Sequence, residues 1–115
     1  FYRPDRCKFF KTKLRTIKIK KNMGWCDDVE SNKYNKIVRI SKKIKYEKMF
    51  RTDHKYDLLI PINYNMPKTI RNKGSAIFLH LTRDFKPTAG CVALKKNDFL
   101  ILLKLIKKNT KIKII

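Results

Sequence analysis

The chain has 115 residues, 43% of them hydrophobic, so it can bury a core of its own, and we expect one domain over residues 1–115. Its 30 Lys and Arg residues against 9 Asp and Glu give a net charge of +21, a balance that often indicates a polyanionic partner. These basic residues are spread along the whole chain, however, which favours a generally basic surface, and we expect no nucleic-acid partner. No apolar run reaches the roughly 18 residues of a membrane-spanning helix, so we predict no transmembrane segment.

The three cysteines, Cys7, Cys26 and Cys91, are widely spaced, and only two histidines accompany them. Without a Cys-x-x-Cys pair, this set predicts no metal site. A Cys7–Cys26 disulfide that leaves Cys91 free is compatible with the sequence, which does not decide it. The chain opens at Phe1 with residues that read as the middle of a domain, so we expect an upstream segment, and an export signal is not visible.

The first third of the chain predicts short strands joined by a polar loop. Residues 14–20 alternate between apolar and polar, the pattern of a half-buried strand, which then ends near Gly24. Residues 25–35 predict a polar loop with one large aromatic side chain, Trp25, which either anchors the loop by packing or forms a wall of a functional cleft. Residues 36–40 predict another short strand.

The middle of the chain predicts the centre of a sheet. Residues 42–52 carry few apolar side chains among lysines and predict a helical turn or a basic loop. Residues 57–65 predict a strand, which Pro61 would restrict to an edge or a bulge because proline lacks the amide donor. Residues 75–82 are apolar on both faces and predict the central strand.

The end of the chain predicts one helix and one strand. Asn97 and Asp98 can cap a helix whose apolar stripe is formed by Phe99, Leu100, Leu102, Leu103 and Ile106. Residues 110–115 alternate Lys with Ile and predict a final strand. The fold class is therefore mainly β with one C-terminal helix (α+β).

One stretch can carry chemistry: the central strand delivers His80, a polar loop follows, and Cys91 comes directly after Gly90. A cysteine attacks as its thiolate, whereas a free thiol with a pKa of ~8.5 is only slightly ionised at neutral pH. A neighbouring imidazole can take the proton and return it to a leaving amine. The loop is long enough to bring the two side chains together, and either Asp84 or a backbone carbonyl can orient the ring.

Gly90 would let the backbone approach a substrate carbonyl, so that the amides of Gly90 and Cys91 can form an oxyanion hole. The alternative is purely structural, because cysteine is often buried and histidine often ends a strand without a role. In that case the chain would be a basic module that binds nucleic acid or a cell-wall polymer, with an inert Cys91.

The central stretch also has the residues of a known family. Residues 88–94, Thr-Ala-Gly-Cys-Val-Ala-Leu, followed by Asp98, a helix and residues 109–114, resemble the L,D-transpeptidase catalytic domain, the YkuD-like family. Residues 25–28 and 34–35 resemble a divergent bacterial branch of that family.

The resemblance implies an L,D-transpeptidase-like β-sandwich or barrel that lacks its N-terminal strands. It implies that Cys91 is the nucleophile, His80 the base and Gly90 part of the catalytic turn. This sequence departs from the family in three respects. Ala89 stands where the family has a histidine, and Ala93 where it has an arginine. The loop from His80 to Cys91 is shorter than usual, with Leu81 in place of a common glycine.

The resemblance further implies acyl transfer between peptidoglycan stem peptides, with no cofactor. Cys91 would form an acyl-enzyme, which an amine resolves to give a cross-link, or which water resolves as in an L,D-carboxypeptidase. Thr88, Trp25 and Arg83 are the residues that we expect to contact the substrate. We expect a monomer in the periplasm or at the cell wall.

Overall fold

The computed structural model describes residues 1–115 and contains six strands and one helix, which confirms a mainly β fold with one C-terminal helix. The elements in chain order are β1 (Met23–Cys26), β2 (Ile37–Arg39), β3 (Tyr46–Lys48), β4 (Leu59–Pro61), β5 (Phe78–Leu81), β6 (Val92–Leu94) and α1 (Lys96–Leu105).

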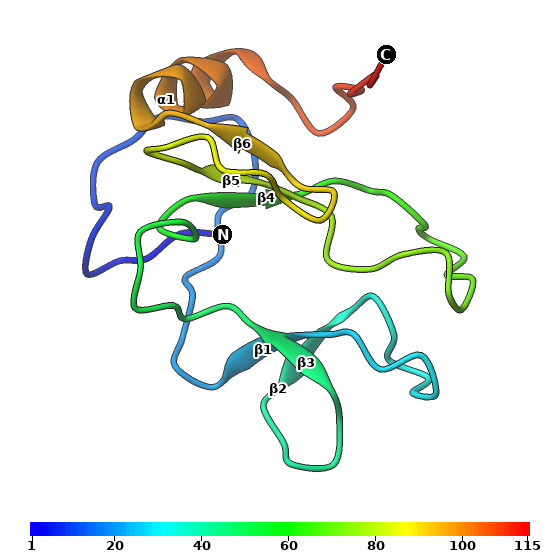
Figure 1. Cartoon of the computed structure of the whole chain (residues 1–115). Helices are drawn as coiled ribbons and strands as arrows, with labels where there is room; N and C mark the ends of the chain where they lie inside the picture. Colours follow the sequence, from blue (N-terminus) through cyan, green and yellow to red (C-terminus); the bar gives the residue numbers. More distant parts are fainter.

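The strands form two three-stranded sheets, which lie one above the other in Figure 1. The first sheet has the order β2-β1-β3 and is antiparallel throughout. The second sheet has the order β4-β5-β6, in which β4 is antiparallel and β6 parallel to the central β5. The two sheets are layers with α1 beyond the second sheet, and they do not close into a barrel (Figure 1).

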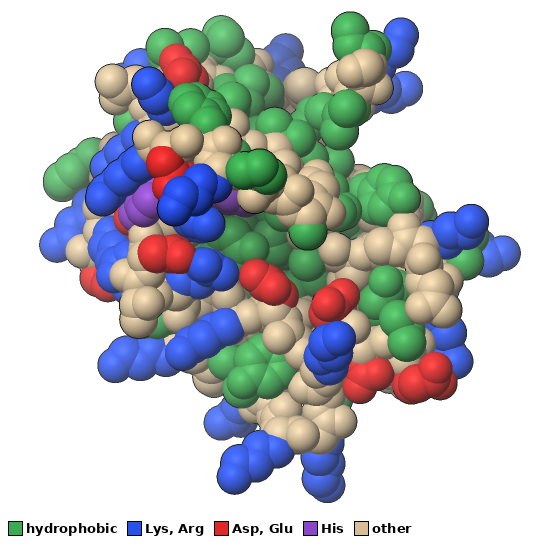
Figure 2. Space-filling model, in the orientation of Figure 1, with side chains coloured by type: hydrophobic (Ala, Val, Ile, Leu, Met, Phe, Trp, Pro, Cys, Tyr) green, Lys and Arg blue, Asp and Glu red, His purple; other side chains and the backbone are tan.

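Basic side chains are scattered over the molecule. In Figure 2, Lys and Arg side chains surround the visible face, with hydrophobic and acidic side chains between them. No helix is long and apolar enough to cross a membrane.

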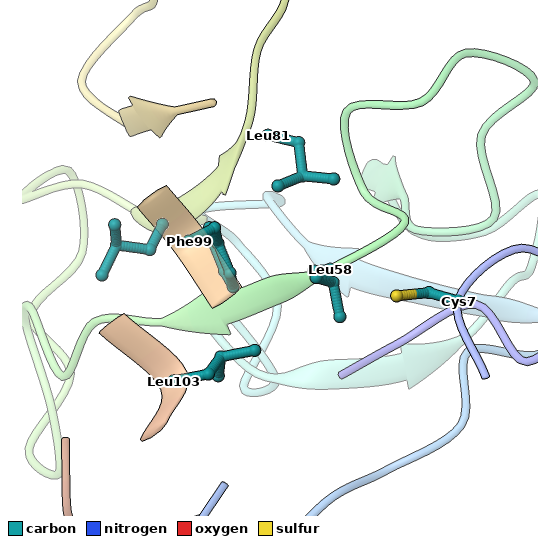
Figure 3. Packing of buried hydrophobic residues seen from close by; sticks show 6 residues of the cluster. Cys7, Leu58, Leu81, Phe99 and Leu103 are labelled. Carbon is teal, nitrogen blue, oxygen red and sulfur yellow. The ribbon is translucent and has the colours of Figure 1, made fainter. Parts of the chain in front are cut away.

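The four residues of β5 are all buried, and their alternation divides the core in two. Leu79 and Leu81 belong to the helix cluster, which also contains Cys7, Leu58, Phe99 and Leu103. Figure 3 shows Phe99 and Leu103 of α1 among Leu58, Leu81 and Cys7. The prediction of a central strand with two apolar faces is thus confirmed.

Phe78 faces the other way and belongs to the inter-sheet cluster, which consists of Ile19, Trp25, Met49, Tyr56, Leu59 and Phe78. Its ring packs edge-on against Trp25 at 5.2 Å and against Tyr56 at 5.7 Å between centroids. Edge-to-face pairs of this kind are favourable beyond their buried area. The inter-sheet cluster therefore joins the two sheets through aromatic contacts.

Three predicted elements need correction. Residues 14–20 do not form a strand, and their pairing reduces to a single bridge between Lys18 and Tyr2. Residues 42–52 are neither a helical turn nor only a loop, because they contain β3. Residues 110–115 are exposed and pair with nothing, so the alternation of Lys and Ile there does not mark a strand.

The polar loop predicted over residues 25–35 begins later than expected, because Trp25 and Cys26 lie in β1, the central strand of the first sheet. Gly24 suggests the end of a strand, yet it lies inside β1. A Cβ atom at this position would come within 3.0 Å of Cδ2 of Tyr46, on the neighbouring strand. The glycine thus makes room for an aromatic ring inside the sheet.

Other predictions are confirmed. Residues 36–40 contain β2, and Pro61 lies in β4, an edge strand of the second sheet. The helix buries Phe99 and Leu103 as expected, but it begins after Lys95, with no side-chain cap, so Asn97 and Asp98 lie inside it. All three cysteines are free, which rules out the Cys7–Cys26 disulfide in this structure.

Candidate functional site

His80 lies on the central strand of the second sheet and is only 5% exposed. Its Nδ1 atom lies 2.8 Å from the carbonyl oxygen of Leu81. Because a carbonyl can only accept a hydrogen bond, Nδ1 carries the proton, and the lone pair of the neutral ring is on Nε2. A backbone carbonyl therefore orients the ring, whereas the carboxylate of Asp84 instead accepts bonds from Thr82 Oγ1 and the Lys86 amide.

The register of β5 and β6 places Cys91 on the same face as His80. His80 pairs with Ala93 and Leu79 with Val92, so one step earlier Cys91 lies beside Phe78. Side chains alternate between the faces of a sheet, and residues two apart share a face. Cys91, Phe78 and His80 therefore all point toward the first sheet, and Cys91 packs against the inter-sheet cluster.

The Cys91 thiol is half-buried, and its Sγ donates to the carbonyl oxygen of Ala76 at 3.4 Å. Burial raises the pKa of this thiol above its ordinary value, with the charge of Glu47 acting in the same direction and a hydrogen bond from the Phe78 backbone opposing it. In the resting protein Cys91 is therefore a neutral thiol at pH 7.

The turn before Cys91 is held by its own side chains. Thr88 Oγ1 donates to the carbonyl oxygen of Cys91 at 2.6 Å and accepts a long bond from the Gly90 amide at 3.4 Å. Gly90 has a φ of +141°, a conformation that favours glycine, and a Cβ atom there would lie 3.2 Å from Cδ1 of Ile77. The glycine in front of Cys91 is thus required by the backbone as well as by the packing.

Two residues that the sequence did not single out border the site. The Tyr56 ring packs against His80, with 5.7 Å between centroids, and its hydroxyl donates to Glu47 Oε1 at 3.0 Å. Glu47 comes from β3, so the first sheet contributes a carboxylate that faces the second sheet. No motif in the sequence links these residues to residues 80–91, since 24 to 44 positions separate them in the chain.

Of the six predicted site residues, Thr88, Gly90 and Cys91 lie in one turn. His80 lies on the adjoining strand, where it pairs with Ala93, two residues after Cys91. Trp25 is 6% exposed and packs on Phe78, so its placement fits the packing interpretation of this side chain.

Arg83 is exposed at the far end of β5 and lines a cavity of about 310 Å³, together with Lys95 and Lys96. Three larger hollows, of about 480, 550 and 840 Å³, lie along residues 8–11, β4 and the helix, and none of them is lined by His80 or Cys91. The candidate site is therefore not one of these hollows.

A family model of the L,D-transpeptidase catalytic domain, YkuD, matches residues 9–114. No curated protein and no solved structure matches the chain. The matched region contains both sheets, the helix and the turn with Cys91. With nearly the whole chain matched, the protein belongs to the L,D-transpeptidase catalytic domain family, YkuD.

Proposed function

We propose that this protein is a cysteine acyl-transferase that remodels peptidoglycan stem peptides, with Cys91 as nucleophile and His80 as base. The observation that supports this most is the parallel β5–β6 register. Continued by one residue, it aligns Cys91 with Phe78, on the face of the sheet that also carries His80. The bond from His80 Nδ1 to the Leu81 carbonyl adds to it, because it leaves Nε2 free to accept a proton.

In the first half of the reaction, Cys91 Sγ attacks an amide carbonyl of a stem peptide while its proton passes to His80 Nε2. The new S–C bond forms a tetrahedral oxyanion, which backbone amides of the Gly90–Cys91 turn can stabilise. The C–N bond then breaks, and His80 returns the proton to the departing amine. The product is a thioester on Cys91.

In the second half, an amine of another stem peptide attacks the thioester and gives its proton to His80, which protonates the departing sulfur. Water in place of the amine would give a peptidase. Because burial raises the pKa of Cys91, the thiol is not ionised beforehand. The proton must therefore move to His80 during the attack, which makes the base essential at neutral pH.

The substrate contacts differ from those of the family pattern. Ala93, which replaces the family arginine, pairs with His80 in the register and adds no charge beside it. Arg83, with Lys95 and Lys96 around its cavity, offers cations for a stem-peptide carboxylate near the same strand. We further propose that the protein acts outside the cytoplasm, in the periplasm or at the cell wall, where this polymer lies.

Turnover of purified disaccharide-tetrapeptide muropeptides tests the proposal. We expect mass spectrometry to find an acyl group on Cys91, no turnover for Cys91→Ala, and a loss on the order of 10²–10⁴-fold for His80→Gln. Cross-linked dimers would identify a transferase and shortened monomers a peptidase.

The matched control is Cys7→Ala, which removes a buried thiol of the helix cluster and should retain turnover. Unchanged turnover in folded Cys91→Ala, or the absence of any acyl-enzyme on the wild-type protein, would refute the proposal.

A further inference from the structure

Asn35 is a buried polar residue that lies between the two sheets and close to the candidate site. It is 2% exposed and follows the loop after β1, where its amide nitrogen donates to the carbonyl of Cys26 at 2.9 Å. Its φ of 58° is a left-handed conformation that asparagine tolerates better than most residues. Figure 1 shows this cyan loop on the same side of the molecule as the segment that leads into β5.

The side-chain amide of Asn35 uses all of its hydrogen-bonding capacity. Oδ1 accepts from Trp25 Nε1 at 3.0 Å and from the Ala76 backbone amide at 3.2 Å. Nδ2 donates to the carbonyls of Tyr64 and Asn65 at 3.1 and 3.2 Å. An amide has two donors and two acceptor lone pairs, so no other side chain of this size could satisfy all four partners.

One of these four bonds connects Asn35 to Ala76, the residue whose carbonyl binds the Cys91 thiol. Ala76 has a φ of 56°, which is unusual for alanine and must be held by its surroundings. Its amide is bound by Asn35, and its carbonyl oxygen accepts the S–H of Cys91. The neighbouring Ser75 supports the same segment, since its hydroxyl donates to the carbonyl of Cys26 at 2.9 Å.

We propose that Asn35 is a positioning residue for Cys91: it fixes the Ala76 peptide, and the Ala76 carbonyl in turn fixes the direction of the thiol. This inference rests on the proposed function only for the role of Cys91. The first sheet would then control the nucleophile of the second sheet through a single side-chain amide. A small displacement of the sulfur is costly, because a misplacement of about 1 Å can reduce the rate ~100-fold.

The variant that tests this is Asn35→Gly. Glycine removes the amide and adopts a φ of 58° without strain, so the loop backbone can stay in place. We expect kcat on muropeptides to fall about 10- to 100-fold with a much smaller change in KM. We also expect the pH midpoint of Cys91 alkylation to fall, since a carbonyl that accepts S–H favours the neutral thiol.

Asn72→Gly is the matched control. Asn72 has a similar φ of 63°, is exposed, and takes no part in the hydrogen bonds of the Asn35 side chain. We expect this variant to keep the wild-type kcat and alkylation midpoint. If Asn35→Gly does not fold, Asn35→Asp retains an acceptor oxygen toward Ala76 but adds a negative charge near the thiol, so we expect its midpoint to rise, opposite to that of the glycine variant.

The outcomes separate this inference from the proposed function. A folded Asn35→Gly protein with wild-type kcat and midpoint would overturn the positioning role, as would an Asn35→Asp protein with a lowered midpoint. Wild-type protein without an acyl-enzyme on Cys91 would overturn the proposed function, whatever the Asn35 variants show.

Discussion

At the scale of single residues, the three thiols have different environments although none is paired. Cys7 and Cys26 are 5% and 0% exposed, whereas Cys91 is half-buried beside an exposed turn. Burial raises the pKa of both Cys7 and Cys91, because it disfavours the charged thiolate. Reactivity at neutral pH should therefore depend on access and on His80, not on a preformed thiolate.

We expect iodoacetamide to modify Cys91 well before Cys7 and Cys26. Since ionisation limits the reaction and burial raises the pKa of Cys91, the rate should increase with pH through a midpoint above that of an ordinary cysteine. Peptide mass spectrometry after timed quenching measures each site separately, with Cys91→Ser as control. Equal labelling of all three cysteines, or a midpoint below that of an ordinary cysteine, would contradict this environment for Cys91.

At the scale of elements, α1 holds the second sheet from behind the candidate site. Phe99 is 0% exposed and Leu103 is 4% exposed, and both pack in the helix cluster against the face of β5 that does not carry His80. The helix has no side-chain cap and is ten residues long. Such a helix is marginal by itself, so its stability must come from this packing.

We expect Phe99→Ala to lower the free energy of unfolding by about 3–5 kcal/mol, because it leaves a cavity in the helix cluster. Ile101→Ala, at a position that is 57% exposed on the same helix, should change it by only about 0.5 kcal/mol. Urea denaturation followed by circular dichroism measures both. A similar loss for the two variants would mean that α1 does not pack as described.

The elements that the sequence predicts correctly are those whose own apolar side chains require burial. The apolar run of β5 and the stripe of α1 each require burial, and both are found. β1 was missed because Gly24 indicates a strand end, while the reason for this glycine is Tyr46, 22 residues away. Residues 110–115 alternate like a strand, but no partner strand lies beside them.

The candidate site also contains residues that the local sequence indicates and residues that it does not. His80, Gly90 and Cys91 are close enough in the chain for their spacing to suggest a common site. Asn35 lies in the connection between β1 and β2, and Glu47 lies in β3. Nothing local in their sequence indicates partners that lie 41 and 9 residues away. Contacts between sheets depend on how the layers pack, which no short pattern encodes.

At the scale of the whole molecule, the net charge of +21 is distributed and not focused. Lys and Arg side chains are scattered over the face in Figure 2, and those around the Arg83 cavity are only a few of the 30. A distributed charge attracts any polyanion without reading its sequence. It should therefore assist the approach to an anionic polymer without selecting a nucleic acid.

We expect the protein to bind duplex DNA weakly at low salt, with an affinity that falls linearly on a log–log plot against salt concentration. Duplexes of different sequence should bind equally, because the attraction comes from phosphates alone. Fluorescence anisotropy at several salt concentrations measures this. A duplex preferred more than about 10³-fold over the others would indicate a nucleic-acid role and contradict the expectation.

The parallel pairing of β5 with β6 has a consequence for how this domain could change over time. The ladder between the two strands determines the face on which His80 and Cys91 lie, while residues 83–90, which connect the strands, are exposed. Insertions and substitutions in that connection should therefore leave the arrangement of His80 and Cys91 undisturbed. A slip of the ladder by one residue would instead turn the sulfur to the opposite face, so selection should tolerate novelty in the connection and resist it in the strands.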